Sequence, residues 1–287
     1  WQFDLGVCDM IPYPEKWRIQ LSNLHKKSDK EIQQTDIKYG LYLGNLAQKF
    51  IQKNKLRVDF ICSHGHTIFH QPKSNYTLQI GNGQSIANQS KKTVICDFRS
   101  LDVSLGGQGA PLVPIGDQLL FEDYYYCLNL GGFSNVSYQK SSIRKAYDIC
   151  PVNIVLNDLA QQLGRSYDKN GAIAQTGHMI DSLFTQLNQL PYYKENAPKS
   201  LGKEWVEQYI QPLIKQHSNI PDLLNTFTEH AAFQIGKNLQ AGSCLITGGG
   251  AFNSYLIERL KCYTKIDIYL PNKKIIDYKE ALIFAFL

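Results

Sequence analysis

The sequence predicts a two-lobed α/β protein in which mixed sheets are flanked by helices. The chain has 287 residues, of which 43% are hydrophobic, so it can bury one large core or two cores of ordinary domain size. In its second half, helical segments alternate with strands and glycine turns, which is typical of α/β proteins. A new strand follows a Gly- and Pro-rich stretch. We therefore expect a boundary near 120–123, with a first lobe of residues 1–122 and a second of 123–287.

The elements of the first lobe follow from hydrophobic spacing. Apolar residues recur at threes and fours over 28–53, which predicts a helix. Short apolar runs predict buried strands at 58–62, 76–80 and 93–96. The Gly- and Pro-rich residues 106–116 predict a loop, either over a site or at the junction of the lobes.

The second lobe is predicted to begin with a hairpin. A strand over 124–130 turns at Gly131-Gly132 into a partner at 135–138. The remaining segments alternate in type: helices are expected near 153–164, 171–188, 204–217, 222–240 and 252–262, and strands at 244–247 and 266–270.

Composition excludes several classes of protein. The net charge of +5 comes from scattered Lys and Arg without a long basic block, which argues against nucleic-acid binding. The seven cysteines are spread singly and form no C-x-x-C pair, so buried thiols in a reducing compartment are favoured over a structural zinc site. No apolar run has the ~18–20 residues that span a membrane. We expect a soluble, cytoplasmic protein.

The sequence starts without a polar leading segment and finishes within a helical run of apolar residues. The first residues, WQFDLGV, lack a Met and a polar lead-in, and the last eight, EALIFAFL, form an uncapped apolar helical run. We expect that the chain is part of a longer protein.

Two glycine clusters stand where strands are predicted to end. Gly131-Gly132 joins two strands, and Gly248-Gly249-Gly250 joins a strand to a helix. Such turns let backbone N–H groups approach an anion, although tight turns that merely need positive φ are the alternative. Two of them in one chain favour a nucleotide. Neither matches a P-loop or a dinucleotide motif. A hairpin whose glycine turn contacts phosphate resembles the actin-like, hexokinase-like and Hsp70-like ATPases.

Eight stretches together resemble the anhydro-N-acetylmuramic acid kinase family. They occur in order along most of the chain: SHGHTIFHQP at 63–72, QIG at 79–81, CDFRSLD at 96–102, GGQGAPLVP at 106–114, NLGGFSN at 129–135, DICPVN at 148–153, KSLGKE at 199–204 and TGGGAFN at 247–253.

This resemblance implies a fold and an activity. The fold would be two actin-like (RNase H-like) lobes with ATP and sugar in the cleft between them. The enzyme would use ATP and Mg²⁺ to phosphorylate O6 of 1,6-anhydro-N-acetylmuramic acid while water opens the anhydro bond at C1, giving N-acetylmuramic acid 6-phosphate in peptidoglycan recycling. It would be a homodimer. Another actin-like sugar or acyl kinase, or a non-catalytic nucleotide-binding relative, stays an alternative.

The resemblance also implies roles for individual residues. Asp148 would be the catalytic base, although a cap for the helix beginning near Asn153 is the alternative. The family pattern Asp-Thr-Gly-Pro-x-Asn differs here, because Ile149 and Cys150 replace Thr and Gly, and losing the glycine restricts the backbone. Cofactor binding would fall to residues of the two glycine turns: Gly131, Gly132, Asn135, Gly248, Gly249, Gly250 and Asn253.

The sugar would be bound by residues of the first lobe, namely His64, Asp97, Arg99, Asp102, Gly107 and Gln108. Arg99 can pair with the lactyl carboxylate of the sugar, or form an ion pair with Asp97 or Asp102.

Three further features of this pattern stay open. The His64, His66 and His70 spacing suggests zinc at first sight, but polar contacts are favoured. Lys199 and Lys203 either meet phosphate or lie on a solvated loop. The Gly-Thr-Ser-x-Asp-Gly phosphate turn that opens the family is absent from this sequence, so the metal ligands are unknown.

Overall fold

The computed structural model describes residues 1–71, 74–141 and 143–287, and Pro72 of the first family-like stretch lies outside them. The chain forms two compact units. The large unit comprises Trp1–Phe3 and Pro114–Lys279, and the small unit comprises Asp4–Val113 and Glu280–Leu287. The predicted α/β class is confirmed, with mixed sheet and flanking helices. Within the described residues, no helix combines the length and apolar character needed to cross a membrane.

A five-stranded sheet is the centre of the large unit, in the order β7-β6-β5-β8-β9. The hairpin neighbours β5, β6 and β7 are antiparallel, while β5, β8 and β9 run parallel. The strands are β5 (Tyr126–Leu130), β6 (Phe133–Lys140), β7 (Ile143–Pro151), β8 (Ser243–Thr247) and β9 (Asp267–Tyr269).

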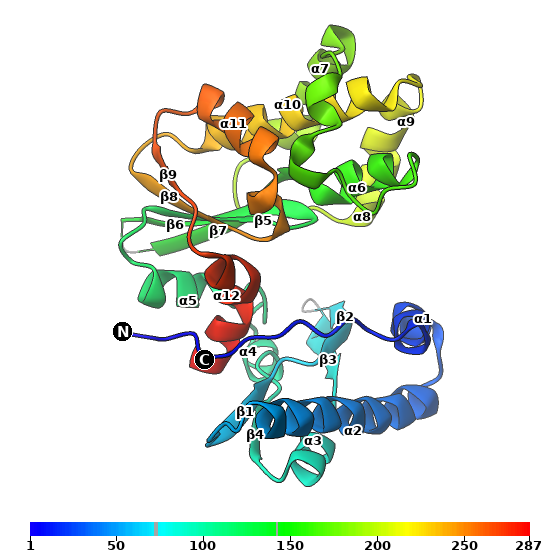
Figure 1. The fold of residues 1–287 in the computed structure, drawn as a ribbon, viewed down its shortest axis with the longest axis vertical. Coiled ribbons are helices and arrows are strands. Elements are labelled where there is room, and N and C mark those ends of the chain that lie inside the picture. Colours follow the sequence, from blue (N-terminus) through cyan, green and yellow to red (C-terminus); the bar gives the residue numbers. More distant parts are fainter. Residues whose placement is uncertain (72–73, 142) are drawn as a thin grey trace. The chain divides into compact units, whose positions relative to one another are not determined.

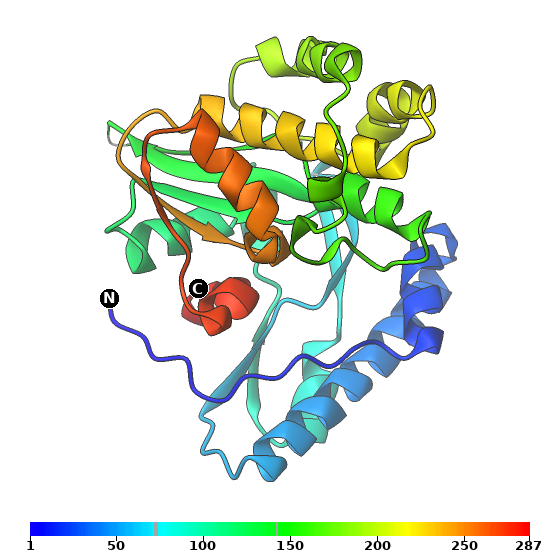
Figure 2. The same ribbon diagram turned by 45° about the horizontal axis from the view of Figure 1, so that its top comes forward.

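Helices cover both faces of this sheet (Figures 1 and 2). The helices of the large unit are α5 (Val113–Leu120), α6 (Asn153–Gln161), α7 (Asp181–Asn188), α8 (Lys203–Trp205), α9 (Gln211–Ile214), α10 (Ile220–Asn238), α11 (Ser254–Tyr263) and the first half of α12 (Lys273–Phe286). On one face, α5 and α12 are joined by a buried ion pair between Asp117 and Lys279, and the Asp117 carboxylate also accepts a hydrogen bond from Ser137 of β6.

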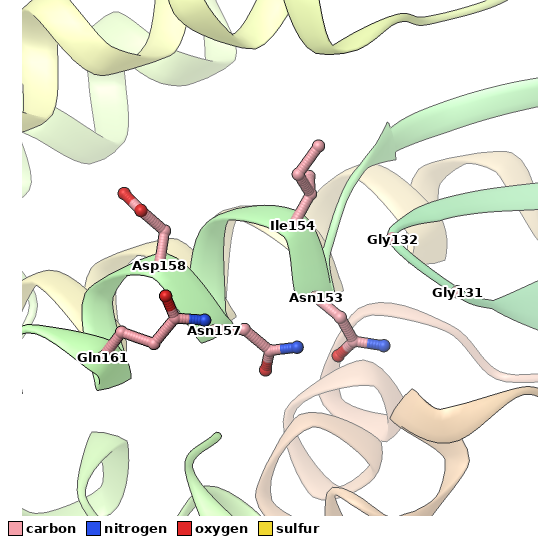
Figure 3. A pocket seen from close by; sticks show the side chains of 7 residues that line it. All are labelled: Gly131, Gly132, Asn153, Ile154, Asn157, Asp158 and Gln161. Carbon is pink, nitrogen blue, oxygen red and sulfur yellow. The ribbon is translucent and has the colours of Figure 1, made fainter. Parts of the chain in front are cut away.

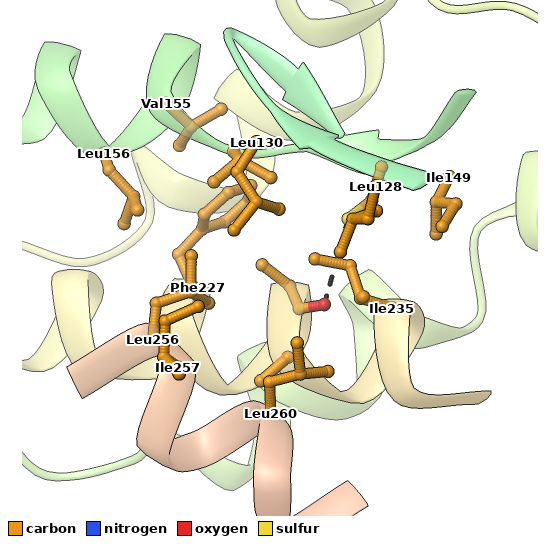
Figure 4. Close-up of a cluster of buried hydrophobic side chains, with 14 of the residues drawn as sticks. Leu128, Leu130, Ile149, Val155, Leu156, Phe227, Ile235, Leu256, Ile257 and Leu260 are labelled. Carbon is orange, nitrogen blue, oxygen red and sulfur yellow. Dashed lines mark hydrogen bonds between the residues drawn. The ribbon is translucent and has the colours of Figure 1, made fainter. Parts of the chain in front are cut away.

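The core of the large unit lies on the opposite face. Figure 4 shows Leu128 and Leu130 of β5 with Phe227 of α10 and Leu256 of α11. Because β5 is the central strand, four of its five residues are buried. The nineteen-residue helix α10 is buried along most of its length, polar residues such as Asn225 and His230 included, so its sequence is not strictly amphipathic.

The small unit contains a long helix and two short sheets. Its elements are α1 (Glu15–Asn23), α2 (Asp29–Lys53), β1 (Phe60–Ser63), β2 (His66–Gln71), β3 (Tyr76–Ile80), α3 (Gly83–Ser90), β4 (Thr93–Cys96) and α4 (Ser100–Ser104). Helix α2 begins with a capping box between Ser28 and Glu31. Strands β1 and β4 pair in parallel, and β2 and β3 are antiparallel. Gly40 and Gly44 of α2 allow α3 to approach closely, because a Cβ at either position would meet α3 or its cap at under 3.0 Å.

Two expected elements differ from the structure. Residues 171–188 do not form one helix: short 3₁₀ turns at Lys169–Gly171 and Ala174–Thr176 come before α7. The cause is local, because Gly171 has φ of +71° and the backbone of Gly177 packs directly against Pro221. The expected loop at 106–116 ends early, since α5 begins at Val113 and accommodates Pro114 in its first turn.

Candidate active site

The two glycine turns meet at the end of the large-unit sheet where strands β5 and β8 finish. Strands β5 and β8 are parallel neighbours, with Asn129 opposite Thr247, so their carboxyl ends lie side by side. Gly248 has φ of +83°, and a Cβ there would lie 2.5 Å from Asn129 Oδ1 and 2.9 Å from the Leu130 carbonyl oxygen. A Cβ on Gly250 would lie 2.7 Å from Leu130 Cβ. The second turn therefore packs against the end of the strand that carries the first.

Gly131 and Gly132 bind the start of α6. The Gly132 carbonyl accepts hydrogen bonds from the N–H groups of Val152 and Ile154, and the Gly131 carbonyl accepts one from Asn153. Asn153 Nδ2 also donates to the Leu130 carbonyl oxygen at 3.0 Å. These bonds fix the hairpin turn, α6 and the end of β5 as one assembly. Of the glycines in the two turns, only Gly248 needs positive φ, so the tight-turn explanation does not account for the others.

An open pocket of about 560 Å³ lies beside the first turn (Figure 3). Gly131 and Gly132 form one wall, and the polar face of α6 forms another. The α6 residues that line it are Asn153, Ile154, Asn157, Asp158 and Gln161.

A polar row crosses the same end of the sheet. Asn129, Asn135 and Asp148 are directly opposite one another on β5, β6 and β7. Opposed residues point to the same face of a sheet, so these three side chains share a face. The structure thus brings Asn135 and Asp148 together with the glycine turns. Asn253 is used differently, because its Oδ1 accepts the Leu256 N–H and caps α11.

Asp148 is half-buried and is held by hydrogen bonds to three residues of one segment. Its Oδ2 accepts the Leu201 N–H at 2.9 Å, its carbonyl oxygen accepts the Tyr192 hydroxyl at 2.6 Å, and its own N–H donates to the Lys199 carbonyl at 3.1 Å. Burial raises the pKa of the Asp148 carboxyl above its usual value, and the Leu201 N–H opposes that rise. The carboxylate does not cap α6, whose N-cap is Val152, so the helix-cap alternative is wrong.

The Ile149 and Cys150 departure lies inside the core. Both side chains are buried, and Cys150 belongs to β7 with an ordinary negative φ. The Cys150 N–H donates to Ser134 Oγ, and Ser134 Oγ donates to the Cys150 carbonyl. The restriction expected from losing a glycine has no consequence here, since the strand conformation at this position is open to any residue.

In the small unit, Arg99 joins several of the residues expected at the sugar. Its Nε donates to His64 Nε2 at 3.0 Å and its Nη1 donates to the Gly109 carbonyl at 2.6 Å. The His64 ring packs against Phe284, with centroids 4.4 Å apart and the ring planes inclined at 44°. Burial, and then the nearby Arg99 charge, lower the pKa of His64, so it is neutral and accepts this hydrogen bond at Nε2.

The glycine loop after α4 is tied to the same cluster. Asp102 Oδ2 accepts the Gly109 N–H at 2.6 Å, and a Cβ on Gly107 would collide with that carboxylate. Gln108, between Gly107 and Gly109 in the chain, is exposed. Asp97 has φ of +59° and accepts the Ser100 N–H at the start of α4. Among the ion pairs of the described residues, none joins Arg99 to Asp97 or Asp102, so the structural ion-pair alternative is wrong.

The structure also describes the surroundings of the histidines and lysines that the sequence left open. No group of three His, Cys, Asp or Glu side chains within residues 1–71, 74–141 and 143–287 is arranged to hold a metal ion. Lys199 Nζ donates to the Tyr192 carbonyl at 2.9 Å, which neither alternative anticipated. Lys203 is exposed and pairs with Glu207 on the next turn.

Sequence reasoning missed Tyr192, Leu201 and Asn129. Leu201 acts through its backbone N–H, so its residue type carries no signal, although the KSLGKE stretch marks the region. Asn129 lies within the NLGGFSN stretch. Because side chains alternate between the two faces of a strand, Asn129 points to the face opposite the buried Leu128 and Leu130.

A carboxylate beside two glycine turns, at the carboxyl ends of strands in an α/β sheet, is an arrangement suited to nucleotide-dependent phosphotransferases. The family model "Anhydro-N-acetylmuramic acid kinase" matches residues 2–287, and the chain belongs to this family.

Curated relatives bear this name in several bacteria. The protein of Aliivibrio fischeri is 37% identical over 79% of this chain and 67% of its own length. That of Bacillus thuringiensis subsp. konkukian is 34% identical over 88% and 74%, and that of Mannheimia succiniciproducens is 31% identical over 99% and 84%.

Two solved structures are more distantly similar. One is the activator of 2-hydroxyisocaproyl-CoA dehydratase from Clostridium difficile with bound ADPNP, at 13% identity and a TM-score of 0.41, covering 74% of this chain and 84% of that one. The other is component A of (R)-2-hydroxyglutaryl-CoA dehydratase from Acidaminococcus fermentans, at 15% identity and a TM-score of 0.38, covering 75% and 76%.

Proposed function

We propose that this chain converts 1,6-anhydro-N-acetylmuramic acid to N-acetylmuramic acid 6-phosphate with ATP, in peptidoglycan recycling. The observation that carries the proposal is Asp148, a half-buried carboxylate beside two glycine turns in a chain whose residues 2–287 match the kinase family model.

The reaction requires one water and one nucleotide. The oxygen of water forms a bond to C1 while the C1–O6 bond breaks. O6 in turn forms a bond to the γ-phosphorus, and the bond from that phosphorus to the bridging oxygen of ADP breaks. The proton of the attacking water needs an acceptor, and Asp148 is the group that we assign to this role. The net change is addition of water to the ring and transfer of one phosphoryl group, with ADP as the second product.

The surroundings of Asp148 suit a general base. Its carboxylate accepts one backbone N–H, and the principal influence on its pKa is burial, which raises the pKa and strengthens the base. Even so, a base must be ionised to act, and the Leu201 N–H stabilises the ionised form.

The ATP phosphates are assigned to the second glycine turn. Gly248 is locked by its positive φ and by Asn129, while Gly249 is exposed, and the nearest atom to a Cβ there would be Asn153 Nδ2 at 4.0 Å. An anion can therefore approach the Gly249 backbone. The buried Thr247 Oγ1 has no hydrogen-bond partner in the described part of the chain, as expected where a bound group completes the site. These features fit a polyphosphate.

The other nucleotide-binding assignments follow from their place in the fold. Gly131, Gly132 and Asn135 line the same sheet edge, and Gly250 and Asn253 support the second turn. Mg²⁺ belongs to the proposed reaction, where it would neutralise phosphate charge. The described residues offer no cluster of three ligand side chains for it, so we assign it no protein ligand.

The sugar is assigned to the small-unit cluster of His64, Asp97, Arg99, Asp102, Gly107 and Gln108. Arg99 uses two of its donors, one on His64 and one on the Gly109 carbonyl, and a guanidinium has five. The remaining donors suit a carboxylate such as the lactyl group of the substrate. Asp102 accepts the Gly109 N–H and Arg99 donates to the Gly109 carbonyl, which fixes the loop that carries Gly107 and Gln108.

The test replaces Asp148 by Asn, which keeps the shape of the side chain and removes the base. We expect product formation from 1,6-anhydro-N-acetylmuramic acid to fall by ~10²-fold or more while sugar binding, measured by calorimetry, stays within a few-fold. Asp267→Asn, an exposed carboxylate of β9, is the control and should match wild type. Wild-type turnover by Asp148→Asn, or turnover of hexoses or acetate in place of the anhydro sugar, would contradict the proposal.

We also propose that the enzyme is a cytoplasmic homodimer, as the family resemblance implies. Light scattering after size-exclusion chromatography should give twice the 32.6 kDa mass of the chain, and a monomer mass at working concentration would refute the dimer.

A further inference from the structure

One short segment, residues 192–201, holds Asp148 at three of its atoms. The Tyr192 hydroxyl bonds the Asp148 carbonyl, the Lys199 carbonyl accepts the Asp148 N–H, and the Leu201 N–H bonds the Asp148 carboxylate. We name these residues the Asp148 clamp. Two of the three bonds fix the backbone of Asp148, and the third fixes the direction of its carboxylate.

Two residues of the clamp, Lys199 and Tyr192, also contact each other. Lys199 Nζ donates to the Tyr192 carbonyl at 2.9 Å and lies over the Tyr192 ring, 4.4 Å from its centroid. The Tyr192 ring in turn packs against Trp205, with centroids 5.4 Å apart. Lys199 is therefore occupied within the clamp.

The clamp is also rooted in the core of the large unit. The Tyr193 hydroxyl is 2.9 Å from His230 Nε2, and His230 Nδ1 is 2.8 Å from Asn188 Oδ1. His230 is fully buried on α10, and Asn188 ends α7. A hydrogen-bonded chain thus connects the clamp to two helices whose positions are set by packing.

We propose that Tyr192 and the Leu201 peptide are positioning groups for the reaction: Tyr192 fixes the Asp148 backbone, and the Leu201 N–H aims the Asp148 carboxylate. The inference rests on the proposed function of Asp148 as base. On this proposal, the KSLGKE stretch contributes to the site through its backbone contacts to Asp148 and not through the charges of its lysines.

The physical reason lies in the balance at the carboxylate. Burial raises the pKa of Asp148, and the Leu201 N–H lowers it because the donor stabilises the anion. The titratable groups that face Asp148 are Tyr192 and Cys150, whose pKa values are raised first by burial and further by the Asp148 charge, with Lys199 and Glu195 flanking Tyr192. Burial keeps Tyr192 and Cys150 neutral, so the Leu201 N–H is the main group favouring the ionised carboxylate.

The first test removes the Leu201 N–H by Leu201→Pro, with Leu201→Ala as the matched variant that loses the leucine side chain but keeps the N–H. Loss of the donor should move the acid limb of the kcat/KM–pH profile up by roughly one to two pH units, because a bond to a charged group has about that effect. Leu201→Ala should keep the acid limb of wild type. An unmoved limb in folded Leu201→Pro would overturn the proposal.

A readout without activity separates this inference from the proposed function. The ¹³C resonance of the Asp148 carboxyl, assigned by its loss in Asp148→Asn, gives the pKa directly, and Leu201→Pro should raise it by the same amount. If wild type never phosphorylates the sugar, the proposed function fails while this titration still tests the clamp. An unchanged pKa refutes the clamp even in an active enzyme.

The second test is Tyr192→Phe, which suits the case in which Leu201→Pro does not fold. We expect kcat to fall by about tenfold with KM for the sugar within about twofold, since the base is misaligned but the sugar residues are untouched. Tyr209→Phe, a partly exposed tyrosine of the neighbouring helix, should keep both constants. A rise in KM with unchanged kcat, or equal losses in both variants, would contradict a positioning role.

Discussion

Cys150 occupies a position at which the family pattern has glycine. Its side chain is fully buried, 3.2 Å from Ser134 Oγ and 3.9 Å from the Ala231 carbonyl oxygen. The Cys150 side chain therefore fills space between β7 and α10.

Restoring the glycine should destabilise this chain. Cys150→Gly removes a buried side chain and adds backbone freedom to the unfolded state, so the free energy of unfolding should fall by about 1–3 kcal/mol. Urea unfolding measures this change. The control is Cys262→Ala, an exposed cysteine of α11, which should stay within about 0.5 kcal/mol of wild type. Equal or greater stability of Cys150→Gly would show that the thiol is not packed as described.

At the scale of elements, the second glycine turn depends on two glycines in different ways. Gly248 has positive φ and no room for a Cβ, whereas Gly249 is exposed and has room for one. The pair gives a matched comparison within a single turn.

We expect Gly248→Ala to weaken ATP binding by tenfold or more and to lower stability by ~1–3 kcal/mol, because the added methyl meets Asn129 and the Leu130 carbonyl. Gly249→Ala should fold like wild type, with its effect confined to ATP. Titration calorimetry with ATP and urea unfolding measure the two effects. Equal stability of both variants would contradict the packing of Gly248 against β5.

At the scale of the whole molecule, a buried histidine makes stability depend on pH. His230 is fully buried between the clamp and Asn188, and burial lowers its pKa to about 3. The unfolded chain binds a proton at this residue below its ordinary pKa, ~6.5, while the folded chain does not until about pH 3. Stability should therefore be lost as pH falls through this window.

The expected slope from His230 is about 1.4 kcal/mol per pH unit between pH 6 and pH 4. Urea midpoints across that range measure it. His230→Gln should lower the slope by about 1.4 kcal/mol per pH unit, even if the variant is less stable than wild type at neutral pH. The exposed His178→Gln is the control and should keep the slope of wild type. An unchanged slope in His230→Gln would mean that the imidazole is protonated in the folded chain.

Periodicity and turn chemistry predicted most of the fold. The α/β class, helix α2, the β5–β6 hairpin and helices α6, α10 and α11 follow from apolar spacing and from Gly131-Gly132, because these signals are local. The division of residues 171–188 was not predictable in the same way. It depends on the contact of Gly177 with Pro221, which is distant in sequence.

The sequence alone determined that the chain belongs among sugar kinases and named Asp148, Arg99 and the glycine turns, because motif residues keep their order along the chain. Only the tertiary structure decided what surrounds them. Strand pairing set Asn129 and Asn135 beside Asp148, and backbone groups of Lys199 and Leu201 fastened it. Every residue carries the same N–H and C=O, so contacts made by the backbone leave no trace in residue type and appear only once the chain is folded.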